Sequence, residues 1–162
     1  MTLNPSDALE HAIALAVKSH FGQRDKAGQP YILHVLRVMH AVNDPIAKQA
    51  AVLHDYIEDV GGTVVELNRH LISPLAIQAI VLLSKPEHSN YCEYVISLSS
   101  NPIAVQVKLA DLDDNYRIGR VAYRAGHEAD DAKRIQKYAL TFQFLSKAIC
   151  TDEYRKRMVG LE

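Results

Sequence analysis

The sequence predicts an all-α protein, an irregular bundle of helices. Apolar residues recur with helical spacing along most of the 162 residues. Proline, glycine and helix-capping residues divide the chain into segments of helical length. The composition, 48% hydrophobic and 23% charged, is ordinary for a globular protein. We therefore expect a single domain over residues 1–162.

Three helices are expected in the first part of the chain. The first lies within residues 4–22, with Ser6 as a plausible N-cap and Gly22 at its end. A polar loop follows, and Pro30 suits the first turn of a helix over residues 31–42. Asn43 or Asp44 can cap a third helix, expected over residues 46–60 and stopped by two glycines.

The remaining elements follow from the same signals. Thr63 and Glu66 have the spacing of a capping box, which predicts a short helix. Further helices are expected over residues 73–86, 90–100, 101–117, 132–150 and 151–159. The segment 90–100 would also suit a strand because it is rich in β-branched and aromatic residues. Residues 119–131 favour a loop or a frayed helix.

Composition narrows the function classes. The formal net charge is −1, so no overall positive field would attract nucleic acid or an anionic membrane. Two cysteines without CxxC spacing indicate neither a disulfide framework nor a thiolate metal site. No apolar run approaches the length of about 20 residues that spans a bilayer, and residues 1–10 lack a signal-peptide pattern. We expect a cytoplasmic protein; its oligomeric state is left open.

The stretch AVLHDYIEDV, residues 51–60, carries four titratable side chains on an otherwise apolar segment: His54, Asp55, Glu58 and Asp59. On a continuous α-helix, these positions fall within about 140° of one another around the axis. Three carboxylates on one helix face repel one another unless a cation or protons neutralise them. The alternative is a solvated charged patch with His54 on the surface.

Two other segments favour a metal site. Asp111 follows the apolar run VQVKLA, and isolated buried carboxylates are rare unless they are paired or bind metal. His34 lies among aliphatic residues in PYILHVLRV, where a core histidine is the ordinary interpretation. Two imidazoles and two carboxylates together suit Mn²⁺, Fe²⁺ or Zn²⁺ better than Ca²⁺ or Mg²⁺.

The order of these motifs resembles a known family. PYILHVLRV, AVLHDYIEDV and VKLADLDDN carry the H…HD…D pattern of the HD superfamily of metal-dependent phosphohydrolases. Within it, the HFGQ stretch, GQPY and KLAD followed by Asn115 are most similar to the RelA/SpoT hydrolase domain and to the small Mesh1-like alarmone hydrolases. The resemblance covers roughly residues 8 to 145 and implies an HD-type helical bundle.

The resemblance implies roles for individual residues. Those that match the metal ligands are His34, His54, Asp55 and Asp111. Glu58 and Asp59 match the acidic pair that positions or activates the attacking water. Substrate contacts are expected from Arg24, Lys26, Tyr31, Lys108 and Asn115. His20 either matches a family histidine or is a residue at a helix end that packs against the following loop.

The implied reaction is removal of the 3′-pyrophosphate from (p)ppGpp, giving GDP or GTP and pyrophosphate. The implied cofactor is a divalent metal, Mn²⁺ before Fe²⁺ or Zn²⁺, and the implied partner is a small nucleotide. Two alternatives stay open. One is an HD-type phosphohydrolase acting on a different, less charged nucleotide, and the other is a non-catalytic nucleotide-binding sensor.

The chain departs from the pattern at three places. Asp25 stands where the family has the first of two adjacent basic residues, which puts guanine recognition in doubt. Val35 replaces the usual proline after the first ligand histidine. Asp113 and Asp114 are additional acids, expected to weaken the binding of a highly anionic substrate.

Overall fold

The computed structural model describes residues 4–117 and 125–161, and it confirms an all-helical architecture. The helices are α1 (Pro5–Ser19), α2 (Ile32–His40), α3 (Pro45–Val52), α4 (Tyr56–Val60), α5 (Val64–Arg69), α6 (Pro74–Leu83), α7 (Tyr91–Leu98), α8 (Pro102–Tyr116), α9 (Glu128–Leu145) and α10 (Thr151–Met158). In the described residues the only β-type pairing is an isolated bridge between Arg24 and Pro30. The segment expected as either helix or strand therefore forms a helix, α7.

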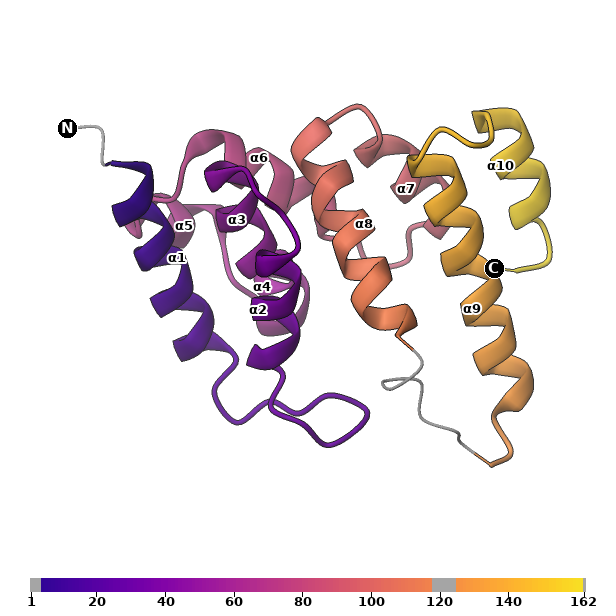
Figure 1. Ribbon diagram of the computed structural model, residues 1–162, viewed down its shortest axis with the longest axis horizontal. Coiled ribbons are helices and arrows are strands. Elements are labelled where there is room, and N and C mark those ends of the chain that lie inside the picture. Colours follow the sequence, from indigo (N-terminus) through magenta and orange to yellow (C-terminus); the bar gives the residue numbers. More distant parts are fainter. Residues whose placement is uncertain (1–3, 118–124, 162) are drawn as a thin grey trace.

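Helix α3 lies at the centre of the first part of the bundle. It packs against α1, α2, α6 and α8. Its inward face carries Ala47, Ala50, Ala51 and Val52, all fully buried. Small side chains let neighbouring helices approach closely, which explains how so short a helix contacts four others. Helix α8 lies between this group and α9, with α10 beyond (Figure 1).

Helix boundaries follow local capping chemistry where it is strong. The Asp44 side chain accepts the backbone N–H groups of Ile46 and Ala47 at the start of α3. Thr63 and Glu66 form the complete capping box of α5. Asn90 and Asn101 cap α7 and α8 through their side-chain oxygens. These four polar side chains satisfy helix N–H groups that would otherwise lack partners.

Other boundaries differ from the sequence-based expectation. Helix α1 already includes Pro5, so Ser6 lies inside its first turn instead of capping it. Pro30 precedes α2 by two residues and takes part in the bridge to Arg24. Helix α9 begins at Glu128, four residues earlier than expected. Part of the loop expected over residues 119–131 lies outside the described residues.

The expected continuous helix over residues 46–60 is wrong. Helix α3 ends at Val52, and a turn through Leu53, His54 and Asp55 separates it from α4. In a continuous helix, the carbonyl of Ala51 would accept the N–H of Asp55. Here Nδ1 of His54 lies 2.7 Å from that carbonyl oxygen and takes its place. His54 and Asp55 therefore lie in a junction between two helices, which lets adjacent side chains turn towards the same point.

Candidate metal centre and adjoining cleft

Side chains from three places in the fold converge beside α3. His34 comes from α2, His54 and Asp55 from the α3–α4 turn, and Asp111 from α8. Nε2 of His34 lies 3.3 Å from Oδ1 of Asp111 and 3.8 Å from Oδ2 of Asp55. Nε2 of His54 lies 2.9 Å from Oδ2 of Asp55 and 3.7 Å from Oδ1 of Asp111. The four predicted metal ligands thus lie together.

Both imidazole rings direct the same nitrogen to this point. Nδ1 of His34 lies 2.6 Å from Oδ2 of Asp114, and Nδ1 of His54 lies 2.7 Å from the carbonyl oxygen of Ala51. Each acceptor is an oxygen, so each Nδ1 carries the proton that it donates. With the proton on Nδ1, each Nε2 is the ring nitrogen that can bind an ion.

The donor set fits a divalent cation. His34, His54 and Asp111 are buried and form, among the described residues, a group whose ligand atoms lie within 4.8 Å of one another. Nε2 of His54 is buried without a hydrogen bond, although Oδ2 of Asp55 is close to it. Metal–ligand bonds of about 2.1 Å imply ligand separations of about 3.0–3.5 Å between neighbours, near those seen here. An ion would supply the missing partner of His54 and neutralise the two carboxylates.

The surrounding charges keep the carboxylates ionised. Burial alone would raise the pKa of Asp111, but the Lys108 ammonium, 2.9 Å away, and the two histidines hold that pKa well below its usual range. Burial would lower the pKa of His54, whereas Asp55 and Asp111 raise it well above its usual value. Ionised carboxylates are the form that binds a metal.

Two further side chains contact the ligand carboxylates. The Tyr31 hydroxyl donates to Oδ2 of Asp55 at 2.6 Å, and Nδ2 of Asn115 donates to Oδ1 of Asp111 at 2.6 Å. Burial and the Asp55 carboxylate raise the pKa of Tyr31, so its hydroxyl stays protonated and remains a donor. These hydrogen bonds fix the orientation of both carboxylates.

A cleft of about 490 Å³ opens next to the centre. Its lining includes six of the residues predicted from sequence for catalysis or substrate binding: Arg24, Lys26, Tyr31, Glu58, Asp59 and Asn115. Lys108 is absent from the lining because its ammonium group contacts Asp111, so its role as a phosphate contact stays a prediction. The cleft is thus bounded by basic groups of the 22–30 loop and by the acidic pair of α4.

Glu58 and Asp59, the acidic pair, are exposed to the cleft, and each carboxylate accepts a hydrogen bond. The backbone N–H of Lys85, just after α6, donates to Oε2 of Glu58 at 2.9 Å. The Gln23 side chain donates to Oδ2 of Asp59 at 3.1 Å. Gln23 in turn accepts a hydrogen bond from Nδ1 of His20, which is buried at the end of α1. His20 therefore packs against the loop that supports the acidic pair.

The three acids that depart from the family pattern lie at different places in the structure. Oδ1 of Asp25 accepts the backbone N–H groups of Ala27 and Gln29, so this carboxylate organises the loop, although it also lines the cleft. Asp114 is buried between His34 and Arg37. Neither Asp113 nor Asp114 lines the cleft, so their effect on the binding of an anionic substrate stays a prediction.

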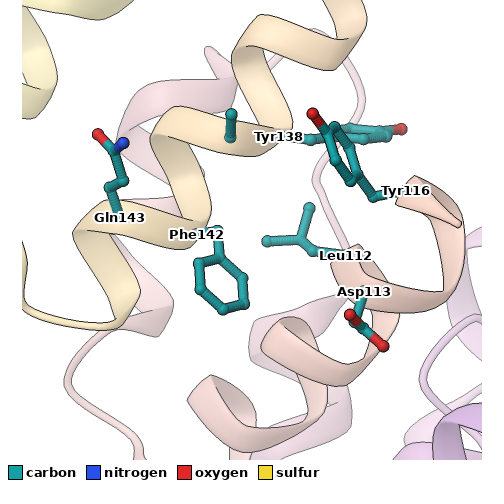
Figure 2. Close-up of a pocket in the computed structure, with 7 residues that line it drawn as sticks. Leu112, Asp113, Tyr116, Tyr138, Phe142 and Gln143 are labelled. Atoms are coloured by element: carbon teal, nitrogen blue, oxygen red, sulfur yellow. The ribbon is translucent and has the colours of Figure 1, made fainter.

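Asp113 instead borders a separate pocket of about 320 Å³ between α8 and α9. Figure 2 shows Phe142 and Gln143 of α9 on one side of this pocket and Leu112 and Asp113 of α8 on the other. Tyr138 lines this pocket and the cleft alike.

Sequence reasoning missed several residues of the site. Arg134 and Tyr138 of α9 line the cleft, and no motif pointed to them because α9 meets the site only through tertiary packing. Arg37 and Asp114 each lie three residues after a predicted ligand, on the same helix. That spacing places them on the ligand's face and was a usable signal.

Comparison with known proteins supports the motif-based resemblance. A protein from Streptomyces coelicolor named GTP pyrophosphokinase is 28% identical over 143 residues, which are 81% of this chain and 17% of that protein. A Vibrio cholerae protein named guanosine-3′,5′-bis(diphosphate) 3′-pyrophosphohydrolase is 30% identical over 125 residues, 68% of this chain and 18% of that protein. The chain therefore spans less than a fifth of these relatives. No family model matches it.

A solved structure shares the fold. It belongs to a protein described as a metazoan orthologue of SpoT that hydrolyses ppGpp. The TM-score is 0.73, with 98% of this chain and 96% of that chain covered at 20% sequence identity. At that identity the likeness establishes the fold, and the helical HD-type bundle expected from the motifs is confirmed. In the part of the chain that the structure describes, no helix is long and apolar enough to cross a membrane.

Proposed function

We propose that this chain, which shares the motifs and fold of the HD-type RelA/SpoT hydrolase group, is a divalent-metal-dependent phosphohydrolase of a nucleotide. The most specific candidate is a (p)ppGpp 3′-pyrophosphohydrolase in the cytoplasm. The convergence of two Nε2 atoms and two carboxylates beside a cleft with an acidic pair carries this proposal. The name of the Vibrio cholerae relative supports the substrate.

In this proposal His34, His54, Asp55 and Asp111 hold the ion, with Mn²⁺ preferred to Fe²⁺ or Zn²⁺. A divalent ion held there would lower the pKa of a bound water to near neutrality and would stabilise the phosphoryl oxygens. The buried His34, His54 and Asp111 side chains exclude bulk water from the inner side of the site. Tyr31 and Asn115 hold the two carboxylates in place from the cleft side.

In this proposal Glu58 and Asp59 transfer protons. Both line the cleft and lie on α4, which directly follows the ligand Asp55. One carboxylate can accept the proton of the attacking water, and the protonated acid can return it to the leaving oxygen. The contacts with Lys85 and Gln23 keep the two carboxylates directed to one side of the cleft.

The substrate would be bound by the cationic end of the cleft. Arg24 and Lys26 lie on the loop between α1 and α2, and both are exposed. Their charges suit phosphates, and the Arg24 guanidinium can also stack on a base. Because Asp25 lies between them and lines the same cleft, a less charged nucleotide is the second candidate substrate.

A substrate panel tests the proposal. Protein purified without chelator is analysed for bound metal, then assayed with Mn²⁺ against ppGpp, pppGpp, GTP and other nucleotides. We expect release of pyrophosphate from ppGpp, with GDP as the other product. Turnover of a simpler nucleotide without turnover of ppGpp would reject the specific candidate, and binding without turnover of any nucleotide would favour the sensor.

The variant Asp55→Ala separates metal chemistry from other sources of activity. In the wild type the Asp55 carboxylate lies between the two imidazoles, and alanine offers no ligand atom in its place. We expect loss of bound metal and of hydrolysis together. Full activity in a metal-depleted Asp55→Ala protein would exclude the proposed centre.

A further inference from the structure

Behind the first histidine of the centre, buried Asp114 forms an ion pair with partly exposed Arg37 that the reaction scheme does not use. Asp114 is 4% exposed and lies on α8, one turn after Asp111. Its Oδ2 atom lies 2.6 Å from Nδ1 of His34. Its Oδ1 atom accepts from Nε of Arg37 at 2.7 Å, and its Oδ2 atom accepts from Nη2 at 3.2 Å.

We propose that Asp114, held by Arg37, is a positioning residue that fixes the His34 ring with Nε2 towards the metal. This inference rests on the proposed function, since it takes His34 as a ligand. A carboxylate that accepts the outer N–H of a ligand histidine fixes the tautomer and the ring orientation and makes the inner nitrogen more basic.

Helix α8 holds the ring from both sides. Asp111 lies 3.3 Å from Nε2, and Asp114 lies 2.6 Å from Nδ1 of the same imidazole. The two acids are three residues apart and therefore share a helix face. One helix thus supplies both a ligand of the metal and the group that orients a second ligand.

Arg37 completes the arrangement from α2. It lies three residues after His34, and its two hydrogen bonds occupy both oxygens of Asp114. A guanidinium that donates two hydrogen bonds fixes the orientation of a carboxylate and also supplies a positive charge. These two hydrogen bonds oppose rotation of the carboxylate away from His34.

The second histidine lacks such a pair. Nδ1 of His54 meets the neutral carbonyl of Ala51, not a carboxylate. A charged acceptor forms a stronger hydrogen bond than a neutral one. We therefore assign the larger outer-sphere effect on metal affinity to the His34 side of the centre.

The test measures Mn²⁺ binding, not hydrolysis. The affinity of the full chain for Mn²⁺ alone is compared by calorimetric titration for the wild type, Asp114→Asn and Asp113→Asn. Asp113 is the matched control, because it is the adjacent acid but is exposed and borders the α8–α9 pocket. We expect Mn²⁺ affinity to fall about 10- to 100-fold in Asp114→Asn and to change less than about twofold in Asp113→Asn.

Thermal unfolding of the metal-free proteins separates positioning from stability. A purely structural role would lower the metal-free melting temperature and leave the Mn²⁺ affinity of the folded protein unchanged, and that result would overturn the proposal. Should Asp114→Asn fail to fold, the double variant Arg37→Gln/Asp114→Asn avoids an unpaired guanidinium. Wild-type Mn²⁺ affinity in that double variant would also overturn it.

A measurement on the unmutated protein gives an independent answer. In the Zn²⁺-loaded wild type, long-range ¹H–¹⁵N spectra should show a protonated Nδ1 and a metal-bound Nε2 at His34. The opposite assignment would overturn the proposal. If the wild type binds Mn²⁺ and hydrolyses no nucleotide, the proposed function fails. The positioning role of Asp114 is then still decided by the Mn²⁺ affinities of the variants and by the protonated nitrogen of His34.

Discussion

Lys108→Met tests whether the ammonium group of Lys108 stands in for part of a metal's charge in the metal-free protein. The Lys108 side chain is 15% exposed, and its Nζ atom lies 2.9 Å from Oδ2 of Asp111. Methionine preserves most of the volume and removes the charge. The substitution therefore leaves the Asp111 carboxylate buried without its nearest cation.

The size of the effect follows from this geometry. Two unit charges 2.9 Å apart attract by about 6 kcal/mol at an effective dielectric constant of about 20. Loss of one partner of a buried pair costs about 3–5 kcal/mol of folding stability, since the remaining charge stays desolvated. We expect the metal-free variant to lose stability in that range. Bound Mn²⁺ would neutralise the same carboxylate and should recover a large part of the loss.

Urea unfolding of wild type and variant, each with chelator and with excess Mn²⁺, measures both quantities. Recovery of about 2 kcal/mol corresponds to about 30-fold tighter Mn²⁺ binding by the variant than by the wild type. Lys156→Met is the control, because Lys156 is exposed on α10. An equal loss with and without Mn²⁺ would refute the reasoning, because the ion would then not act on Asp111.

Three further results are expected. Glu58→Ala should retain most of its Mn²⁺ affinity and lose about 10²- to 10⁴-fold in kcat, which is the usual contribution of a general base. Metal titration and initial rates measure the two quantities. An unchanged kcat would show that Glu58 takes no part in the reaction. Gly62→Ala would place a Cβ atom inside the buried Tyr56 ring, so urea unfolding should show about 1–3 kcal/mol of destabilisation, and unchanged stability would contradict the packing of α4. Hydrogen bonds from Thr63 lower the pKa of Glu66. The stability that these bonds contribute is therefore fully present at a pH above the usual pKa of glutamate, and it is lost as the pH falls through the lowered pKa. The difference in melting temperature between wild type and Thr63→Ala should therefore shrink as the pH falls from 7 to below 4.5, and a constant difference would show that the charge of Glu66 does not matter.

Sequence predicted the parts of the fold that depend on neighbours along the chain. The predicted caps Asp44 and Thr63 act on N–H groups two or three residues away, and each marks a helix start in the structure. The structure also brings the predicted ligands close together, and the family resemblance supplied the tertiary information that periodicity lacks.

The remaining features depend on competition or on distant contacts. The end of α3 at Val52 requires that the His54 ring take the Ala51 carbonyl, and periodicity favours a continuous helix there. The role of Asp114 depends on a residue 80 positions earlier, His34. From sequence alone, Asp114 was simply one more negative charge in an acidic stretch.

The turn between α3 and α4 has a mechanical consequence for the whole bundle. It presents two ligands at the place where α2 and α8 also meet α3. A bound ion would therefore cross-link three segments that are distant in sequence. Amide hydrogen exchange in α2, α8 and the 53–55 turn should then slow on loading with Mn²⁺, while α10, which contacts only α7 and α9 among its main neighbours, keeps its rate. Occupancy of the centre would in this way set how rigidly the first half of the molecule is tied to the second.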